Sequence, residues 1–219
     1  MNGPFTQTSP AFPLPSSTPQ AHREPMTFHL TYLGFLAGLL IPPTLRRLRR
    51  GTNARWWWCA PPTALLWCLT GALNVPPSWL PVPLTLAWLG VALTLVDLRH
   101  RRLPNALTLP AYPALLLLLA MSGADPLRAL AGCALFAGAH LLIHLLRPTA
   151  LGGGDVKLSG PLGAVLACVS WTALPLATAL ASLTTLLLSR LPTRNHPPWS
   201  LPHGPGLLGS TWLLSVVAV

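Results

Sequence analysis

Apolar residues come in blocks near twenty residues long, separated by short polar gaps, from residue 27 to the end of the chain. A helix of this length crosses the roughly 30 Å hydrocarbon core of a bilayer. Lipid cannot satisfy backbone polar groups, and the alternating pattern of barrel strands is absent, so the spans must be helices. The pattern predicts eight spans, at about 27–45, 56–75, 79–97, 106–122, 127–146, 158–171, 173–190 and 201–219.

Composition agrees with an all-α, polytopic membrane helix bundle. The chain is 52% hydrophobic and 8% charged, with a mean hydropathy of +0.54, whereas about a quarter of the residues in a soluble domain are charged. Residues 1–25 are rich in Pro, Ser and Thr, a composition typical of a disordered tail. Two regions are therefore predicted, the tail at 1–25 and a membrane-embedded domain at 26–219.

The basic residues indicate a topology rather than a nucleic-acid partner. The formal net charge is +10, but Lys and Arg lie in the short gaps between apolar blocks instead of forming one compact domain. With the N-terminus outside, only Arg23 and Arg128 fall on the outer side. The other basic residues then face the cytoplasm, as the positive-inside rule requires: Arg46, Arg47, Arg49, Arg50, Arg55, Arg99, Arg101, Arg102, Arg147, Lys157, Arg190 and Arg194. This rim should favour anionic lipid headgroups.

The chain has only four acidic residues, and two of them lack a simple structural explanation. Glu24 belongs to the tail, and Asp125 precedes Pro126 as the N-cap of a helix. Asp97 and Asp155 instead lie at the cytoplasmic edge of the predicted hydrocarbon region, where an ionisable side chain is costly enough to indicate function. The alternative is ion pairing, of Asp97 with nearby arginines and of Asp155 with Lys157.

Taken together, Asp97 and Asp155 predict aspartic protease chemistry. Two neighbouring carboxylates in a low-dielectric setting do not both ionise easily, so the pair holds one proton. The ionised member can take a proton from water while the protonated member polarises a peptide carbonyl. Gly152, Gly153 and Gly154 are expected to form a loop with unusual backbone angles that brings a substrate close to Asp155. The loop does not match the P-loop pattern that binds nucleotides.

Three motifs give the chain a resemblance to the type IV prepilin peptidases, the GxGD class of membrane aspartic proteases. "GGGDVKLSGPLG" resembles the GxGD motif, and "DLRHRRLPN" resembles the first aspartate motif with its Leu-Pro-Asn turn. "LPHGPGLLGS", at 201–210, is similar to the third segment, although His203 stands where the family usually has Phe. The third segment is therefore not expected to supply site residues; Pro202, Gly204 and Pro205 should shape the start of the last span.

The resemblance implies that Asp97 and Asp155 are catalytic and that pilin-like or pseudopilin precursors lose a short leader at the cytoplasmic face of the bacterial plasma membrane. Lys157 would tune Asp155 or anchor the helix at the interface by snorkelling, and Pro104 and Asn105 would shape the turn into the fourth span. No cofactor or metal is implied, and the sequence makes no prediction of an oligomeric state.

The resemblance also implies a short form of the enzyme. Larger family members carry a cytoplasmic domain with paired CxxC motifs after the first span, linked to N-methylation of the newly formed terminus. Here that region reads only "RRLRRGTNARWWW", and the chain contains no CxxC pair. A peptidase without methyltransferase activity is therefore expected.

Two other functions fit some of the same residues. A small transporter or channel could use Asp97 and Asp155 to bind cations or relay protons, but such groups usually lie near the bilayer midplane and often in internal repeats, which are not evident here. His140 and His144 share a helix face at a spacing that can bind metal, which would suit a metal-dependent hydrolase. The glutamate of HExxH is missing, because Leu141 follows His140.

Overall fold

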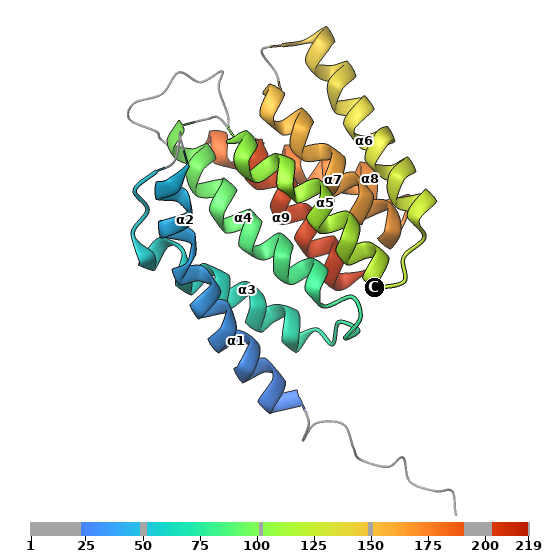
Figure 1. Ribbon diagram of the computed structural model, residues 1–219. Coiled ribbons are helices and arrows are strands. Elements are labelled where there is room, and N and C mark those ends of the chain that lie inside the picture. The colour runs from blue at the N-terminus through green and yellow to red at the C-terminus, as the bar shows by residue number, and fades with distance from the viewer. Residues whose placement is uncertain (1–22, 49–51, 101–102, 149–150, 191–202, 219) are drawn as a thin grey trace, which may run out of the picture.

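The computed structural model describes residues 23–48, 52–100, 103–148, 151–190 and 203–218. Within these ranges the regular elements are all helical, and Figure 1 shows them as a bundle. The elements are α1 (Arg23–Leu39), α2 (Ile41–Arg47), η1 (Trp56–Trp58), α3 (Ala60–Ala72), α4 (Pro81–His100), α5 (Asn105–Met121), α6 (Pro126–Leu146), α7 (Gly153–Val169), α8 (Ala173–Ser189) and α9 (Gly204–Val217).

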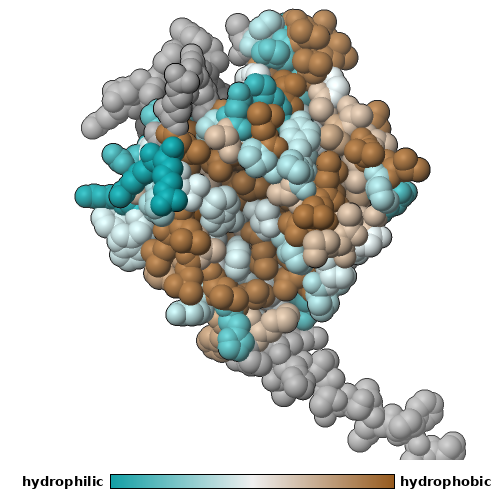
Figure 2. All heavy atoms as spheres, viewed as in Figure 1, coloured by the Kyte–Doolittle hydropathy of each residue, from teal (hydrophilic) through white to brown (hydrophobic). Residues whose placement is uncertain are grey.

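The predicted all-α membrane bundle is confirmed, and each predicted span contains a helix. Three helical segments in the described part of the chain are long and apolar enough to cross a membrane: Met26–Arg47, Pro81–His100 and Pro126–Leu146. Asn105–Met121, Ala173–Leu188 and Gly204–Val217 are apolar but shorter. Figure 2 shows apolar side chains over much of the visible face, as expected for a surface that meets lipid.

Two predicted boundaries were wrong. The second span was predicted from residue 56, but Trp56–Trp58 form a short 3-10 helix and α3 begins only at Ala60. The sixth was predicted from residue 158, but α7 already begins at Gly153 and includes Asp155. Helix α1 also begins at Arg23, inside the predicted tail; residues 1–22 lie outside the described residues.

Helix α7 forms the centre of the bundle and packs against α5, α6, α8 and α9. Its residues from Leu158 to Ala167 are all buried. Gly163 lets α6 and α7 approach closely, because a Cβ built there would lie 2.5 Å from the carbonyl oxygen of Gly132 on α6. Gly132 has the same relationship to the carbonyl of Gly163, so the two backbones are in mutual contact. Small residues commonly hold membrane helices together in this way.

Helix ends fix which residues share one end of the bundle. Asp97 lies in the last turn of α4, Asp155 in the first turn of α7, and Gly204 begins α9. The opposite end includes the start of α6, where Asp125 Oδ1 accepts a hydrogen bond from the Leu127 N–H at 2.9 Å. The predicted N-cap role of Asp125 is therefore confirmed.

Candidate active site

Asp97 and Asp155 converge on the first residue of α9. Their exposed fractions are 5% and 8%, so both carboxyl groups are removed from bulk solvent. A Cβ built on Gly204 would lie 3.0 Å from Asp97 Oδ2 and 3.3 Å from Asp155 Oδ1. Both oxygens thus lie within 3.3 Å of one point, although the two residues are far apart in sequence. The structure brings the two predicted catalytic carboxyl groups together.

Local helix geometry orients Asp155. Gly152 is the N-cap of α7, which makes Asp155 the third residue of the helix. Its carboxyl group accepts a hydrogen bond from the backbone of Gly152, as an acidic residue at the third position does in a capping box. This hydrogen bond holds the Asp155 side chain over the first turn of α7, so that its carboxyl group faces the start of α9. The position of one aspartate is therefore set by its own helix.

The pair has unusual electrostatics for two aspartates. Burial raises the pKa of Asp155, with Asp97 adding to the rise, to about 7, while the hydrogen bond from Gly152 opposes it. Asp155 lies in the first turn of α7, at the end of the bundle. The pair therefore holds one proton near neutral pH, shared between the two carboxyl groups.

Two basic residues near the aspartates, Arg99 and Lys157, make hydrogen bonds to other groups. Arg99 follows Asp97 by two positions, but its Nη1 donates to Thr52 Oγ1 at 2.8 Å and to the Asn53 carbonyl at 2.6 Å. Lys157 is exposed, and its Nζ donates to Asn105 Oδ1 at 3.1 Å. This geometry therefore does not favour the alternative of an ion pair between Lys157 and Asp155. Arg101 and Arg102 lie outside the described residues.

The predicted glycine loop was wrong in its backbone conformation. Gly153 and Gly154 belong to α7, and Gly152 has φ −71°. Within the described residues, positive φ occurs at Asn74 and Gly123 and not at these three glycines. Gly154 allows close packing, because a Cβ there would lie 3.1 Å from the Cβ of Leu103, whereas Gly152 and Gly153 are exposed. The segment before α5, rather than a substrate, occupies that space.

Pro104 and Asn105 connect the two aspartate motifs. Pro104 is the N-cap of α5, and Asn105 is its first residue. Asn105 accepts the hydrogen bond from Lys157. About two helical turns further along α5, the Tyr112 hydroxyl donates to the Lys157 carbonyl at 2.8 Å. These contacts fix α5 against α7. A catalytic or substrate-binding role for Pro104, Asn105 or Lys157 remains a prediction.

Sequence reasoning missed Gly204 and Tyr112. Gly204 was expected only to shape the start of the last span, yet it is the point on which both carboxyl groups converge. The third motif carried that signal, and the departure at His203 led us to leave it out of the site. His203 Nδ1 lies 2.9 Å from Thr185 Oγ1 and helps join α9 to α8. Tyr112 had no distinguishing pattern in the sequence.

The histidines considered as metal ligands each contact a backbone carbonyl. Nδ1 of the buried His140 donates to the Phe136 carbonyl at 2.8 Å, and Nδ1 of His144 donates to the Leu151 carbonyl at 2.7 Å. Carbonyl oxygens only accept, so the Nδ1–H tautomer follows in both rings. Across the part of the chain that the structure describes, no group of three or more His, Cys, Asp or Glu side chains could hold a metal ion.

Comparisons with known proteins find similarity to the family that the sequence motifs resemble. Residues 84–189 match the type IV leader peptidase family, a stretch that includes Asp97 and Asp155 but not Gly204. A prepilin leader peptidase/N-methyltransferase of Aeromonas salmonicida (strain A449) is 35% identical over 161 residues, covering 69% of this chain and 54% of that protein. The protein of the same description from Aeromonas hydrophila is 34% identical with the same coverage. The chain thus spans about half the length of these relatives. No solved structure matches it significantly.

Proposed function

Because residues 84–189 match the type IV leader peptidase family, we propose that the protein is an aspartic endopeptidase of the bacterial plasma membrane that removes the short leader of type IV prepilin-like precursors. The observation that carries the proposal is the convergence of the Asp97 and Asp155 carboxyl groups on Gly204. Paired carboxyl groups with one shared proton provide both the base and the acid of peptide hydrolysis.

The reaction proceeds in two steps. The ionised carboxylate takes a proton from water as the water oxygen bonds to the scissile carbonyl carbon, while the protonated carboxyl group gives its proton to the carbonyl oxygen. In the tetrahedral intermediate, the amide nitrogen then receives a proton from the first carboxyl group, and the C–N bond breaks. The hydroxyl proton returns to the second carboxyl group as the carbonyl reforms. The products are a leader with a new carboxyl terminus and a mature protein with a new amino terminus, and the pair again holds one proton.

A cytoplasmic position of this reaction is supported by the basic residues. Arg99 and Lys157 lie on the same helix turns as the two aspartates, and the described residues Arg46, Arg47, Arg147 and Arg190 lie at helix ends on that side. Arg128 lies at the other end, where its Nε donates to the carbonyl of Ala167 near the end of α7. Cations at one end of a bundle favour the cytoplasmic side.

We further propose that the protein cleaves without methylating its product. The segment between Arg47 and Trp56 is short, and no CxxC pair occurs in the chain. Mass spectrometry of the processed precursor checks this point. The new amino terminus should lack the added mass of one methyl group, whereas a methylated terminus formed in the presence of this protein alone would contradict it.

The test of the proposed function is cleavage of a prepilin-like precursor co-expressed with the wild type, with Asp97→Asn or with Asp155→Asn. Asparagine keeps the size of the side chain but cannot shuttle a proton. We expect cleavage by the wild type and only background cleavage by either variant. Asp125→Asn is the matched control, because Asn caps a helix about as well as Asp and Asp125 lies at the other end of the bundle.

The variants must be compared at equal abundance in the membrane. Normal cleavage by either the Asp97 or the Asp155 variant would show that this carboxyl group is not catalytic. Failure of the wild type on precursors of this class would reject the substrate assignment.

A further inference from the structure

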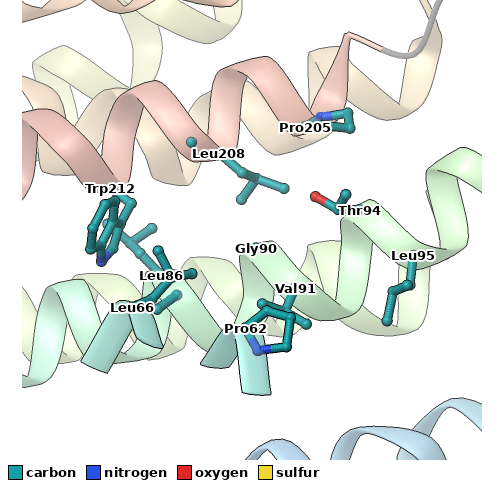
Figure 3. Close-up of a pocket in the computed structure, with 12 residues that line it drawn as sticks. Pro62, Leu66, Leu86, Gly90, Val91, Thr94, Leu95, Pro205, Leu208 and Trp212 are labelled. Atoms are coloured by element: carbon teal, nitrogen blue, oxygen red, sulfur yellow. The ribbon is translucent and has the colours of Figure 1, made fainter. Parts of the chain in front are cut away.

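An apolar groove runs between α4 and α9, with α3 beside it (Figure 3). Its volume is about 200 Å³. Leu86 and Val91 of α4 face Leu208 of α9 across it, and the side chains that line it are apolar except for the Thr94 hydroxyl and the indole N–H of Trp212, which is itself buried. This space suits apolar side chains from one face of a helix and is too small for a whole helix, which is about 10 Å wide.

One end of the groove lies near the paired carboxyl groups. Thr94 lines the groove and lies one helical turn before Asp97. Pro205 lines it from the other side and directly follows Gly204, the residue on which Asp97 and Asp155 converge. The groove extends from there to Trp212, eight residues along α9 from Gly204, which is about 12 Å at 1.5 Å per residue. The groove thus ends within one helical turn of Asp97 and next to Gly204 in sequence.

Two glycines keep this groove open, and packing among the described residues does not require them. A Cβ on Gly209 would meet no described atom within 4 Å, and one on Gly90 would meet only Leu208 Cβ at an ordinary 3.9 Å. Gly206, on the same helix as Gly209, is different, because its Cβ would lie 2.7 Å from the Ala181 carbonyl. A glycine in a helix costs about 1 kcal/mol relative to alanine. At Gly90 and Gly209 no close internal contact compensates for that cost.

We propose that this groove is the docking site for the hydrophobic helix of the membrane-embedded precursor, an inference that rests on the proposed function. Side chains from one face of that helix fill the space over Gly90 and Gly209, as small residues allow between helices in lipid. The end of the docked helix then lies beside Thr94 and Pro205. The leader junction follows directly and reaches Asp97 and Asp155. The groove thereby sets which bond is cut.

The test is to fill the groove from within. Gly209→Leu and Gly90→Leu place a side chain where the precursor helix would lie, and the enzyme alone has room for the added Cβ at both positions. Leucine is also the better helix former, so the variants should fold. We expect cleavage of the full precursor to fall about tenfold or more, because the loss of one buried apolar side chain has an effect of this size.

Gly138→Leu is the matched control. Gly138 is exposed on α6, away from the groove, and a Cβ there would also meet no described atom within 4 Å. The control should cut the full precursor as the wild type does. A second substrate, a peptide that contains the leader junction but ends before the hydrophobic helix, separates docking from chemistry. The loss caused by Gly209→Leu should be about tenfold greater on the full precursor than on this peptide.

The outcomes separate this inference from the proposed function. If Gly209→Leu and Gly90→Leu cut the full precursor like the wild type, docking in the groove is rejected and the peptidase function stands; a groove filled only by lipid gives this result. Equal losses on both substrates would also reject it, because the substitution would then act on the carboxyl groups. If the wild type itself cuts neither substrate, the proposed function fails and this inference fails with it.

Discussion

The phenol of Tyr112 on α5 lies directly on Gly160 of α7, and its hydroxyl donates to the Lys157 carbonyl at 2.8 Å. A Cβ on Gly160 would overlap the Tyr112 hydroxyl, so this glycine is required for the contact. The pair holds α5 and α7 in the register that brings Leu103 onto Gly154 and Asn105 to Lys157. The two aspartate motifs are therefore joined by a contact that includes neither aspartate.

Gly160→Ala should separate Tyr112 from the Lys157 carbonyl. We expect the free energy of unfolding to fall by about 1–3 kcal/mol, the usual cost of an added group in a packed core. Thermal unfolding of the purified protein in detergent measures this loss. Tyr112→Leu combined with Gly160→Ala should show strong coupling, since removing the ring removes the overlap. Additive effects of the two substitutions would contradict the contact.

Gly204→Ala should impair cleavage without preventing folding. The new methyl group would lie 3.0 Å from Asp97 Oδ2 and 3.3 Å from Asp155 Oδ1 and would force the carboxyl groups apart. We expect the cleavage rate to fall by about tenfold or more, because small displacements of catalytic groups have large effects. Gly138→Ala, which adds the same group in open space, should have no effect. Full activity of Gly204→Ala would show that the carboxyl groups do not depend on this close approach.

Cleavage should decline as pH rises through about 7. The pKa of Asp155 is raised to about 7, so the pair keeps its proton below this pH and loses it above. A fully ionised pair has no acid to protonate the carbonyl oxygen. Initial rates from pH 5 to 9, with membrane abundance held constant, measure the decline. A rate that keeps rising above pH 8 would contradict a shared proton.

Stability should depend on pH in the same direction. Between the ordinary aspartate pKa of 3.8 and about 7, the folded state holds a proton on Asp155 that the unfolded chain has released. The free energy of unfolding therefore falls as pH rises across this window and is flat above it. Asp155→Asn should reduce this dependence, which unfolding in detergent at several pH values would measure. An equal slope in the variant would show that another group is responsible.

The predicted topology can be checked with single cysteines. In a background without Cys59, Cys68, Cys133 and Cys168, Asn53→Cys marks the connection between α2 and α3, and Ser78→Cys marks that between α3 and α4. Both positions are exposed. A membrane-impermeant thiol reagent applied to the outer face should label Ser78→Cys and reach Asn53→Cys only after the membrane is opened. The reverse labelling would invert the topology and place the carboxyl groups outside.

Local sequence patterns were enough to predict the helices, to single out the two aspartates and to find the family resemblance. These depend on local properties: the length of an apolar block relative to the bilayer, and the cost of an ionisable group at its edge. The N-cap at Asp125 could also be predicted from the sequence, because an N-cap followed by proline acts within its own helix turn. The start of α7 was misplaced, since a run of glycines indicates a loop unless a neighbouring segment packs on it, as Leu103 does here.

The roles of the individual glycines could be seen only from the packing of the helices. Gly204 lies beside Asp97 and Asp155 because α9 packs against both α4 and α7. Gly160 accommodates Tyr112, whereas Gly90 and Gly209 leave a groove open. A glycine has the same local preferences at each of these positions. What distinguishes them is the distance to a neighbouring helix, which depends on how residues far apart in the sequence pack together, and no local pattern contains that information.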